Sequence, residues 1–333
     1  MLQLKSRRQE RRQGRWWWFL VLGALLLPSA CLAQSYPTKP INLIVPFPPG
    51  GVADIIARPI AERLTKSLGQ PVVVESRGGA TGTLGASFVA QSAPDGYTLL
   101  LGTTNEIAMS PTLYKSMPYD PTKAFAPVTP VAVFPNVLMV GMDVPAKTLA
   151  ELISLARARP NALTFGSSGA GSTNHLTLEI FQRQANVAIR HVPYRGGGPA
   201  VTDVFGGHIT GMFATMPSAI SLIKSGKLRA LAVTGEQRNQ ALPDVPTGVE
   251  SGMPGLVVTT WNGILAPVGT PPEVVDRLHK ALADAVGDPA LKTAFAGLGA
   301  ETELLSPQEF ATRIRRDFDR WSAVIKHAGI SAE

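Results

Sequence analysis

The chain has 333 residues and a formal net charge of +7, with 31 Lys and Arg, 24 Asp and Glu, and one cysteine. Six of the basic residues and one acid lie in the first 33 residues, so residues 34–333 carry a net charge of about +2. This balance argues against a nucleic-acid partner, and the position of the only cysteine, Cys31, leaves residues 34–333 without a disulfide, a thiol nucleophile or a thiolate metal site.

The first 33 residues have the pattern of a secretory signal peptide. Basic residues within 1–15 precede an apolar run at 16–27, and small residues follow at 28–33. The apolar run is shorter than the roughly 20 residues of a membrane-spanning helix. We expect cleavage after Ala33 and export of a periplasmic protein that does not insert into the membrane. Acylation of Cys31, which would give a lipid-anchored protein, is the alternative.

Short β-rich runs alternate with longer amphipathic segments along the rest of the chain. The predicted strands are residues 41–45, 72–75, 98–102, 163–166, 188–192, 209–213 and 229–233. Helical patterns cover 148–159 and 270–286 and resume from Ser306; Thr148 with Glu151, and Ser306 with Glu309, have capping-box spacing. The alternation predicts an α/β fold with mainly parallel sheets covered on both faces by helices.

The length after export suits two domains. Two segments, 134–140 and 257–266, border proline-rich stretches and are predicted to pass between lobes. We therefore expect one lobe from residues 36–136 plus 261–333 and a second lobe from 137–260.

A loop with the sequence VPFPPGGVAD, residues 45–54, follows the first predicted strand. The pair Gly50 and Gly51 lets the main chain approach a ligand, and amides at a helix start attract anions, so a carboxylate is the expected guest. Asp54 is either a ligand contact or, as we favour, the N-cap of the next helix. Pro59 predicts that this helix is kinked or begins late.

A second glycine-rich turn, FGSSGAGSTNHL at 165–176, also follows a predicted strand and enters a helix through Ser172, a suitable N-cap. Two such helix starts, one in each expected lobe, predict a cleft that holds the two ends of a molecule of dicarboxylate size. His175 has the chemistry of a base, but a structural or ligand-contacting role is favoured.

The sequence shows no catalytic or cofactor motif. The stretch at 166–170 has alanine where a nucleophile elbow needs its last glycine, and Walker A and dinucleotide fingerprints are absent. No two histidines have metal-site spacing. We therefore expect a protein that is not an enzyme and has no cofactor or metal. The histidines are His175, His191, His208, His279 and His327.

Six stretches, in this order, resemble the Bug family, the extracytoplasmic solute receptors of tripartite tricarboxylate transporters. They are YPTKPINLIVPFPPGGVADIIAR, DGYTLLLGTT, LYKSMPYDPTKAFAPVT, VPYRGGGPAVTDVFGG, GKLRALAVTGEQRNQALPDVPT and GILAPVGTPPEVV. The resemblance implies a type II periplasmic binding protein fold, in which two α/β lobes joined by crossing strands close on a ligand. It also implies a small carboxylate as the ligand.

Carried over by position, the resemblance assigns ligand contacts to four segments. The family loop commonly has Ser or Thr before the aspartate, whereas this chain has Val52 and Ala53, and many relatives have aspartate where this chain has Ala214. The loss of that acid disfavours an amino-acid ligand, and a mono- or dicarboxylate, with an apolar or aromatic body near Val52, is preferred. The expected ligand-binding residues are Phe47, Pro48, Gly50, Gly51, Val52, Ala53, Asp54, Thr103, Thr104, Asn105, Ser167, Ser168, Gly171, Ser172, Thr173, Asn174, His175, Ala214 and Pro217.

The expected function is therefore that of a monomeric periplasmic receptor, which delivers a small carboxylate to membrane transporter subunits that are separate proteins. A ligand sensor that presents its closed form to a signalling partner is the alternative. A hydrolase using Ser167 or Ser168 with His175 is the least favoured interpretation.

Overall fold

The computed structural model describes residues 36–331. The expected signal peptide of residues 1–33, its cleavage after Ala33 and the alternative acylation of Cys31 all lie outside the described residues. Within residues 36–331, no helix is both long and apolar enough to cross a membrane.

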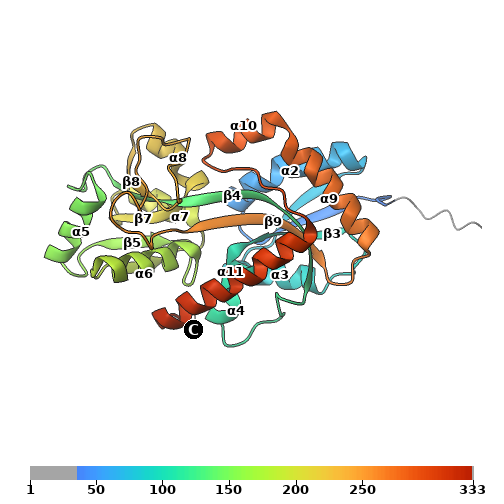
Figure 1. Ribbon diagram of the computed structural model, residues 1–333, viewed down its shortest axis with the longest axis horizontal. Helices are drawn as coiled ribbons and strands as arrows, with labels where there is room; N and C mark the ends of the chain where they lie inside the picture. Colours follow the sequence, from blue (N-terminus) through green and yellow to red (C-terminus); the bar gives the residue numbers. More distant parts are fainter. Residues whose placement is uncertain (1–35, 332–333) are drawn as a thin grey trace, which may run out of the picture. The chain divides into compact units, whose positions relative to one another are not determined.

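The described strands form one curled sheet whose two halves share the long strand β4 (Figure 1). The strand order is β2-β1-β3-β9-β4-β7-β5-β6, with β8 also paired to β4. The strands are β1 (Ile41–Val45), β2 (Val72–Ser76), β3 (Thr98–Thr103), β4 (Phe125–Gly141), β5 (Thr164–Ser167), β6 (Arg190–Pro193), β7 (Gly211–Thr215), β8 (Leu228–Val233) and β9 (Thr259–Pro267).

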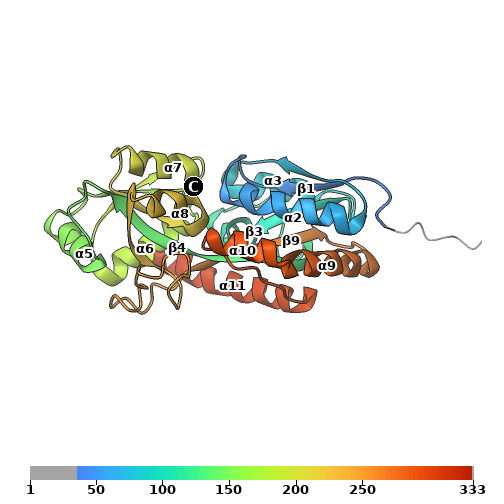
Figure 2. The same ribbon diagram turned by 90° about the horizontal axis from the view of Figure 1, so that it is seen from above.

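Helices cover both halves of this sheet, and α11 runs alongside the crossing strands (Figure 2). Two short helical turns, η2 (Ala80–Gly82) and the π-helical η3 (Asn105–Met109), adjoin the first half. The α-helices are α2 (Val52–Leu68), α3 (Thr83–Ala90), α4 (Ser110–Leu113), α5 (Leu149–Ala158), α6 (Thr173–Ala185), α7 (Gly197–Phe205), α8 (Met216–Lys224), α9 (Pro272–Gly287), α10 (Pro289–Gly297) and α11 (Pro307–Ala328).

The outer strands within each half pair in parallel, whereas the strands that cross between the halves pair antiparallel. In the first half β1 pairs in parallel with β2 and β3, and in the second half β5 pairs in parallel with β6 and β7. The crossing strands are antiparallel: β4 pairs with β9 up to Pro135, and with β7 and β8 from there on. The parallel prediction therefore holds for β1 to β3 and for β5 to β7, while β8 and the crossing strands β4 and β9 depart from it.

Each half has a buried core of its own, and a smaller apolar cluster lies between them. Phe213 packs against Phe165 and Phe181 in the second half, and Trp261 packs edge-on against Phe310 in the first, with ring centroids 5.1 Å apart. The cluster between them joins side chains of η3, α4, α6 and α11 with Val258, which precedes β9; its buried members are Ala108, Met109, Leu113, Leu176, Val258, Trp321 and Ile325. The fold is thus two α/β lobes joined by crossing strands, as expected.

The N-termini of two helices differ from those predicted from the sequence. The box at Ser306 is complete, but Glu151 bonds to the N–H of Lys147 rather than that of Thr148, so the earlier box is half formed. The helix α2 begins at Val52, before Asp54.

Asp54 is therefore not the N-cap, and Pro59 does not delay the helix. The division into lobes of residues 36–136 plus 261–333 and of 137–260 stays a prediction.

Candidate functional site

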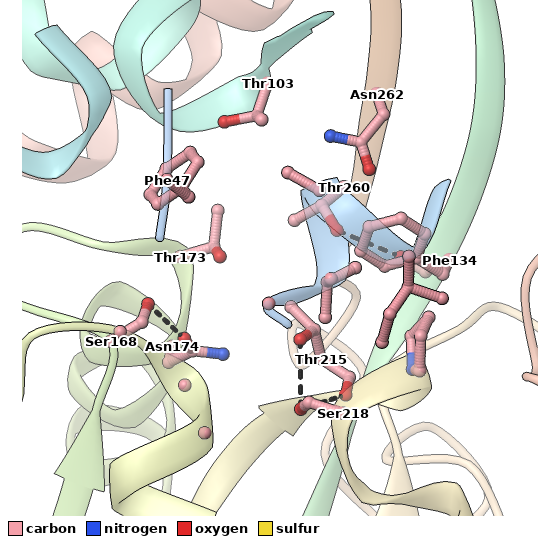
Figure 3. A pocket seen from close by; sticks show the side chains of 18 of the residues that line it. Phe47, Thr103, Phe134, Ser168, Thr173, Asn174, Thr215, Ser218, Thr260 and Asn262 are labelled. Atoms are coloured by element: carbon pink, nitrogen blue, oxygen red, sulfur yellow. Dashed lines mark hydrogen bonds between the residues drawn. The ribbon is translucent and has the colours of Figure 1, made fainter. Parts of the chain in front are cut away.

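A cavity of about 500 Å³ lies between the two lobes (Figure 3). Its walls are the turns that follow β1, β3, β5, β6 and β7, together with parts of β4 and β9. Parallel strands of an α/β sheet place their ligands outside their carboxyl ends, where the next helices begin. The volume lies in the range of about 300–1,000 Å³ that is usual for sites of small organic ligands.

The first wall is the turn between β1 and α2. Gly50 has a φ of +77°, and its N–H donates to Oδ2 of Asp54 at 3.0 Å. Asp54 also pairs with Arg58 at 2.9 Å. Burial alone would raise the pKa of Asp54, but the hydrogen bonds from Arg58 and Gly50 and the charge of Arg58 hold it below its usual value. Asp54 therefore fixes the turn and stays ionised, and it does not line the cavity.

The start of α2 is left open toward the cavity. Gly51 is the N-cap residue and no side chain caps the helix. Val52 and Ala53 line the cavity, and the N–H groups of a first helical turn have no acceptor within their own helix. Because a helix start also carries a partial positive charge, this end of the cavity favours an anion.

At the second glycine-rich turn, before α6, most of the backbone N–H groups already have acceptors. Ser172 caps α6 by accepting the N–H of His175 at 3.4 Å. The Oδ1 atom of Asn105, from the other lobe, accepts the N–H of Thr173 at 3.0 Å. Gly171 donates its N–H to Nδ1 of His175 at 3.0 Å. This helix start therefore offers an anion far less than the start of α2 does.

Ser168 and Asn174 present side chains to the cavity from the same turn. The hydroxyl of Ser168 donates to Oδ1 of Asn174 at 2.6 Å, and Nδ2 of Asn174 donates to the carbonyl of Phe213 at 2.6 Å. The Ser168 hydroxyl thus bonds to an amide and not to His175. The serine–histidine pair of the hydrolase interpretation is not formed at Ser168.

His175 belongs to a half-buried cluster that does not line the cavity. Its ring stacks on that of His191, with centroids 3.8 Å apart, and its Nε2 lies 3.6 Å from Glu179. Nε2 of His191 lies 2.6 Å from Oγ of Ser167. Burial, and then the neighbouring His175, lower the pKa of His191 to about 4. The contact with His175 keeps the pKa of Glu179 below its usual value.

The turn after β3 is anchored from behind by Glu106. The N–H and the hydroxyl of Thr103 both donate to this carboxylate, the hydroxyl at 2.5 Å. The hydroxyl of Tyr119 donates to the Glu106 carbonyl at 2.9 Å. Burial raises the pKa of Glu106 to about 8. The anchor holds Thr103 and Asn105 at the cavity, and it lies in the π-helical turn η3, a type of turn that is common at functional sites.

A third glycine-rich segment, which sequence reasoning did not assign, also lines the cavity. It runs from Arg195 to Pro199, from the end of the β6–α7 connection into the first turn of α7. Gly196 is the N-cap residue of α7, which no side chain caps. Of the described residues that line the cavity, Arg195 alone carries a charge, and it is exposed. It has no ion pair or hydrogen bond with any described residue. The stretch VPYRGGGPA could have predicted this part of the wall, because its three consecutive glycines at a helix start resemble the other two turns.

Most of the expected ligand-binding residues lie on the cavity wall. Those on the wall are Phe47, Pro48, Gly50, Gly51, Val52, Ala53, Thr103, Thr104, Asn105, Ser168, Thr173, Asn174 and Pro217. Those that the structure places behind the wall are Asp54, Ser167, Gly171, Ser172, His175 and Ala214.

The crossing strands supply wall residues that no local motif indicated. Phe134 comes from β4, and Thr260 and Asn262 come from β9. Thr103 and Asn262 lie at one end of the pocket, and Ser168, Asn174 and Ser218 lie at the other (Figure 3). Within residues 36–331 no group of three or more His, Cys, Asp or Glu side chains is placed to hold a metal ion.

Two α/β lobes joined by crossing strands, with a cavity between them at the carboxyl ends of strands from both, form the architecture of a type II periplasmic binding protein. The chain belongs to the tripartite tricarboxylate transporter family of receptors (TctC), whose pattern matches residues 56–330. Protein BugT of Bordetella pertussis is 39% identical over 298 residues, which cover 89% of this chain and 91% of BugT.

Two solved structures extend this similarity to the fold. Rpa4515 of R. palustris, solved with adipate, is 38% identical with a TM-score of 0.86, over 89% of this chain and 99% of that chain. MatC (Rpa3494) of Rhodopseudomonas palustris, solved with bound malate, is 32% identical with a TM-score of 0.82, over 87% of this chain and 100% of that chain.

Proposed function

We propose that this protein is a periplasmic receptor that binds a small carboxylate in the cavity between its lobes and delivers it to a tripartite tricarboxylate-type transporter. The observation that carries the proposal is the uncapped start of α2, whose residues Val52 and Ala53 face a cavity of about 500 Å³. The adipate and malate in the structures of two relatives support a carboxylate.

The carboxylate group binds the open amides at the start of α2, and the cation of Arg195 attracts it from the opposite lobe. The same end of the cavity has an apolar lining from Phe47, Val52 and Ile55, which suits the carbon chain or ring of the ligand. The ligand contacts we propose are the expected residues that lie on the wall, together with Arg195.

An amino acid is disfavoured as the ligand. An ammonium group needs a carboxylate partner, and the described lining residues include none. Ala214, where many relatives carry an acid, is fully buried behind the wall. A mono- or dicarboxylate therefore suits the cavity best.

We propose that the protein acts as a monomer without catalysis, after removal of residues 1–33 as a signal peptide. Closure of the lobes on the ligand presents a surface to the membrane subunits. The hydrogen bond between Asn105 and Thr173 joins one lobe to the other beside the cavity, at the place where such closure would be latched.

A thermal-shift screen of residues 34–333, refolded to remove any ligand retained during purification, tests the proposal. The panel contains mono-, di- and tricarboxylates, amino acids and aromatic acids. A ligand that binds only the native state raises the melting temperature, by an increment that grows with its concentration above Kd. We expect a shift with at least one carboxylate, and no shift with any of them in a cooperatively folding sample would refute carboxylate binding.

Uptake by cells that lack the protein tests the role in transport. Loss of uptake of the carboxylate identified by the screen is expected. Intact uptake together with a lost transcriptional response to that compound would instead support a sensor.

A further inference from the structure

Asn262 is a buried polar side chain on the cavity wall that has no partner. It lies on β9, between Thr103 of β3 and Ala132 of β4, and is only 2% exposed. Its Oδ1 atom accepts no hydrogen bond from any described residue, and its Nδ2 atom donates to none. A buried amide without partners destabilises a protein, so a ligand group that bonds to Asn262 would remove this cost.

The neighbouring hydroxyls do not supply that group. Successive side chains of a strand alternate between its faces, so Thr260 and Asn262 share the face that lines the cavity. The hydroxyl of Thr260 donates to the carbonyl of Phe134 at 3.3 Å, and that of Thr103 donates to Glu106. Asn262 is therefore the side chain at this end whose donor and acceptor both lack a hydrogen-bond partner.

The open atoms define the chemistry of the ligand group. The Oδ1 atom needs a donor, which a carboxylate lacks, and the Nδ2 group needs an acceptor, which an ammonium lacks. A hydroxyl group satisfies both atoms at once. The end of the cavity around Asn262, Thr260 and Thr103 has no cation, which also disfavours a second carboxylate there.

We infer that Asn262 is a specificity-determining residue whose amide hydrogen-bonds to a hydroxyl group of the bound carboxylate. The inference rests on the proposed function and narrows its substrate class to hydroxy acids. Their carboxylate lies at the start of α2, and their hydroxyl lies against β9.

Matched pairs of acids that differ by one hydroxyl group test the inference. The probes are propionate and lactate, succinate and malate, glutarate and 2-hydroxyglutarate, and butyrate and 3-hydroxybutyrate, with each enantiomer measured by calorimetry. For at least one pair, wild-type protein is expected to bind the hydroxylated member about tenfold more tightly.

In Asn262→Leu, which keeps the volume but removes both open atoms, this preference is expected to fall below about twofold. Asn136→Leu is the matched control, because Asn136 is also fully buried with an unpartnered Oδ1 atom but does not line the cavity. It should keep the wild-type preference. Asn262→Ala replaces the leucine variant if that variant does not fold.

The outcomes separate the two proposals. If no acid of any pair binds, the proposed function fails. If the acids bind but wild type never prefers the hydroxylated member, or if Asn262→Leu keeps the preference, a water molecule satisfies Asn262 and the inference is overturned.

Discussion

The two glycine-rich turns at 46–51 and 167–172 look alike in sequence but end in different helix starts. Before α2 no side chain caps the helix, and the next residues face the cavity. Before α6 the N–H groups of Thr173 and His175 are bonded to Asn105 of the opposite lobe and to Ser172. We therefore expect a glycine-rich turn to bind an anion only where the first N–H groups of the helix lack acceptors.

The largest expected effect concerns Glu106, which anchors the segment that caps α6. Its pKa is raised to about 8, so between about pH 4.5 and 8 the native state binds more protons than the unfolded state. The free energy of unfolding therefore falls as pH rises through this range. At about 1.4 kcal/mol per pKa unit, the group contributes a loss on the order of 5 kcal/mol.

Glu106→Gln removes this titration, so its free energy of unfolding should be flatter between pH 5 and 9. Urea denaturation at several pH values measures the slope. Glu62→Gln, at an exposed carboxyl of α2, is the control and should keep the wild-type slope. An unchanged slope in Glu106→Gln would show that Glu106 does not titrate with folding.

Gly171→Val, in the second turn, should lower the stability of the protein. Gly171 has a φ of +73°, and a Cβ atom there would lie 2.5 Å from Cδ1 of Leu113. We expect a loss of about 2–4 kcal/mol in the free energy of unfolding, with little change in ligand affinity of the folded protein. Gly207→Ala has a nearly equal φ, +72°, but open space around the new Cβ atom. It should cost clearly less, and equal losses would exclude the contact with Leu113 as the cause.

Gly51→Val, in the first turn, should weaken ligand binding. The φ of Gly51 is −76°, which any residue adopts, and its Cβ atom would meet only the Pro48 carbonyl, at 3.3 Å. The added side chain occupies the cavity, so affinity should fall about tenfold to a hundredfold, since overpacking costs about 1–3 kcal/mol.

Calorimetry and thermal unfolding of Gly51→Val are compared with Gly287→Val, at an exposed glycine of α9 with open space around it. Wild-type affinity in a well-folded Gly51→Val protein would contradict the placement of the ligand at the first turn.

The smallest expected effect is that of Arg195→Gln. An exposed cation contributes about 0.2–1 kcal/mol to an ion pair, so affinity should fall by about two- to fivefold. The salt dependence of binding should weaken as well. Arg159→Gln, at an exposed arginine that does not line the cavity, should change neither. Equal effects of the two variants would show that Arg195 does not contribute to ligand binding.

The two turns also show which features could be predicted from the sequence and which could not. The strands and the turns at their carboxyl ends were predictable, because glycine, proline and capping residues act on neighbours in the chain. The cap that Asn105 gives to α6 was not, because Asn105 and Thr173 meet only in the folded protein.

Asn262 and Phe134 were missed for a related reason. They belong to the crossing strands β9 and β4, and the register between strands decides which of their side chains face the cavity. Asp54 was misread as an N-cap because its spacing to Gly50 suits either a cap or, as found, a brace for the turn.

Amide NMR during ligand titration tests the central claim most directly. Deuterated, ¹⁵N-labelled protein is titrated with the carboxylate of highest affinity, and the amide signals of the α2 and α6 starts are followed. The account predicts downfield amide-proton shifts at Val52 and Ala53, which gain an anionic acceptor, and small shifts at Thr173 and His175, whose acceptors are already in place. Large shifts at Thr173 and His175 with none at Val52 and Ala53 would contradict it.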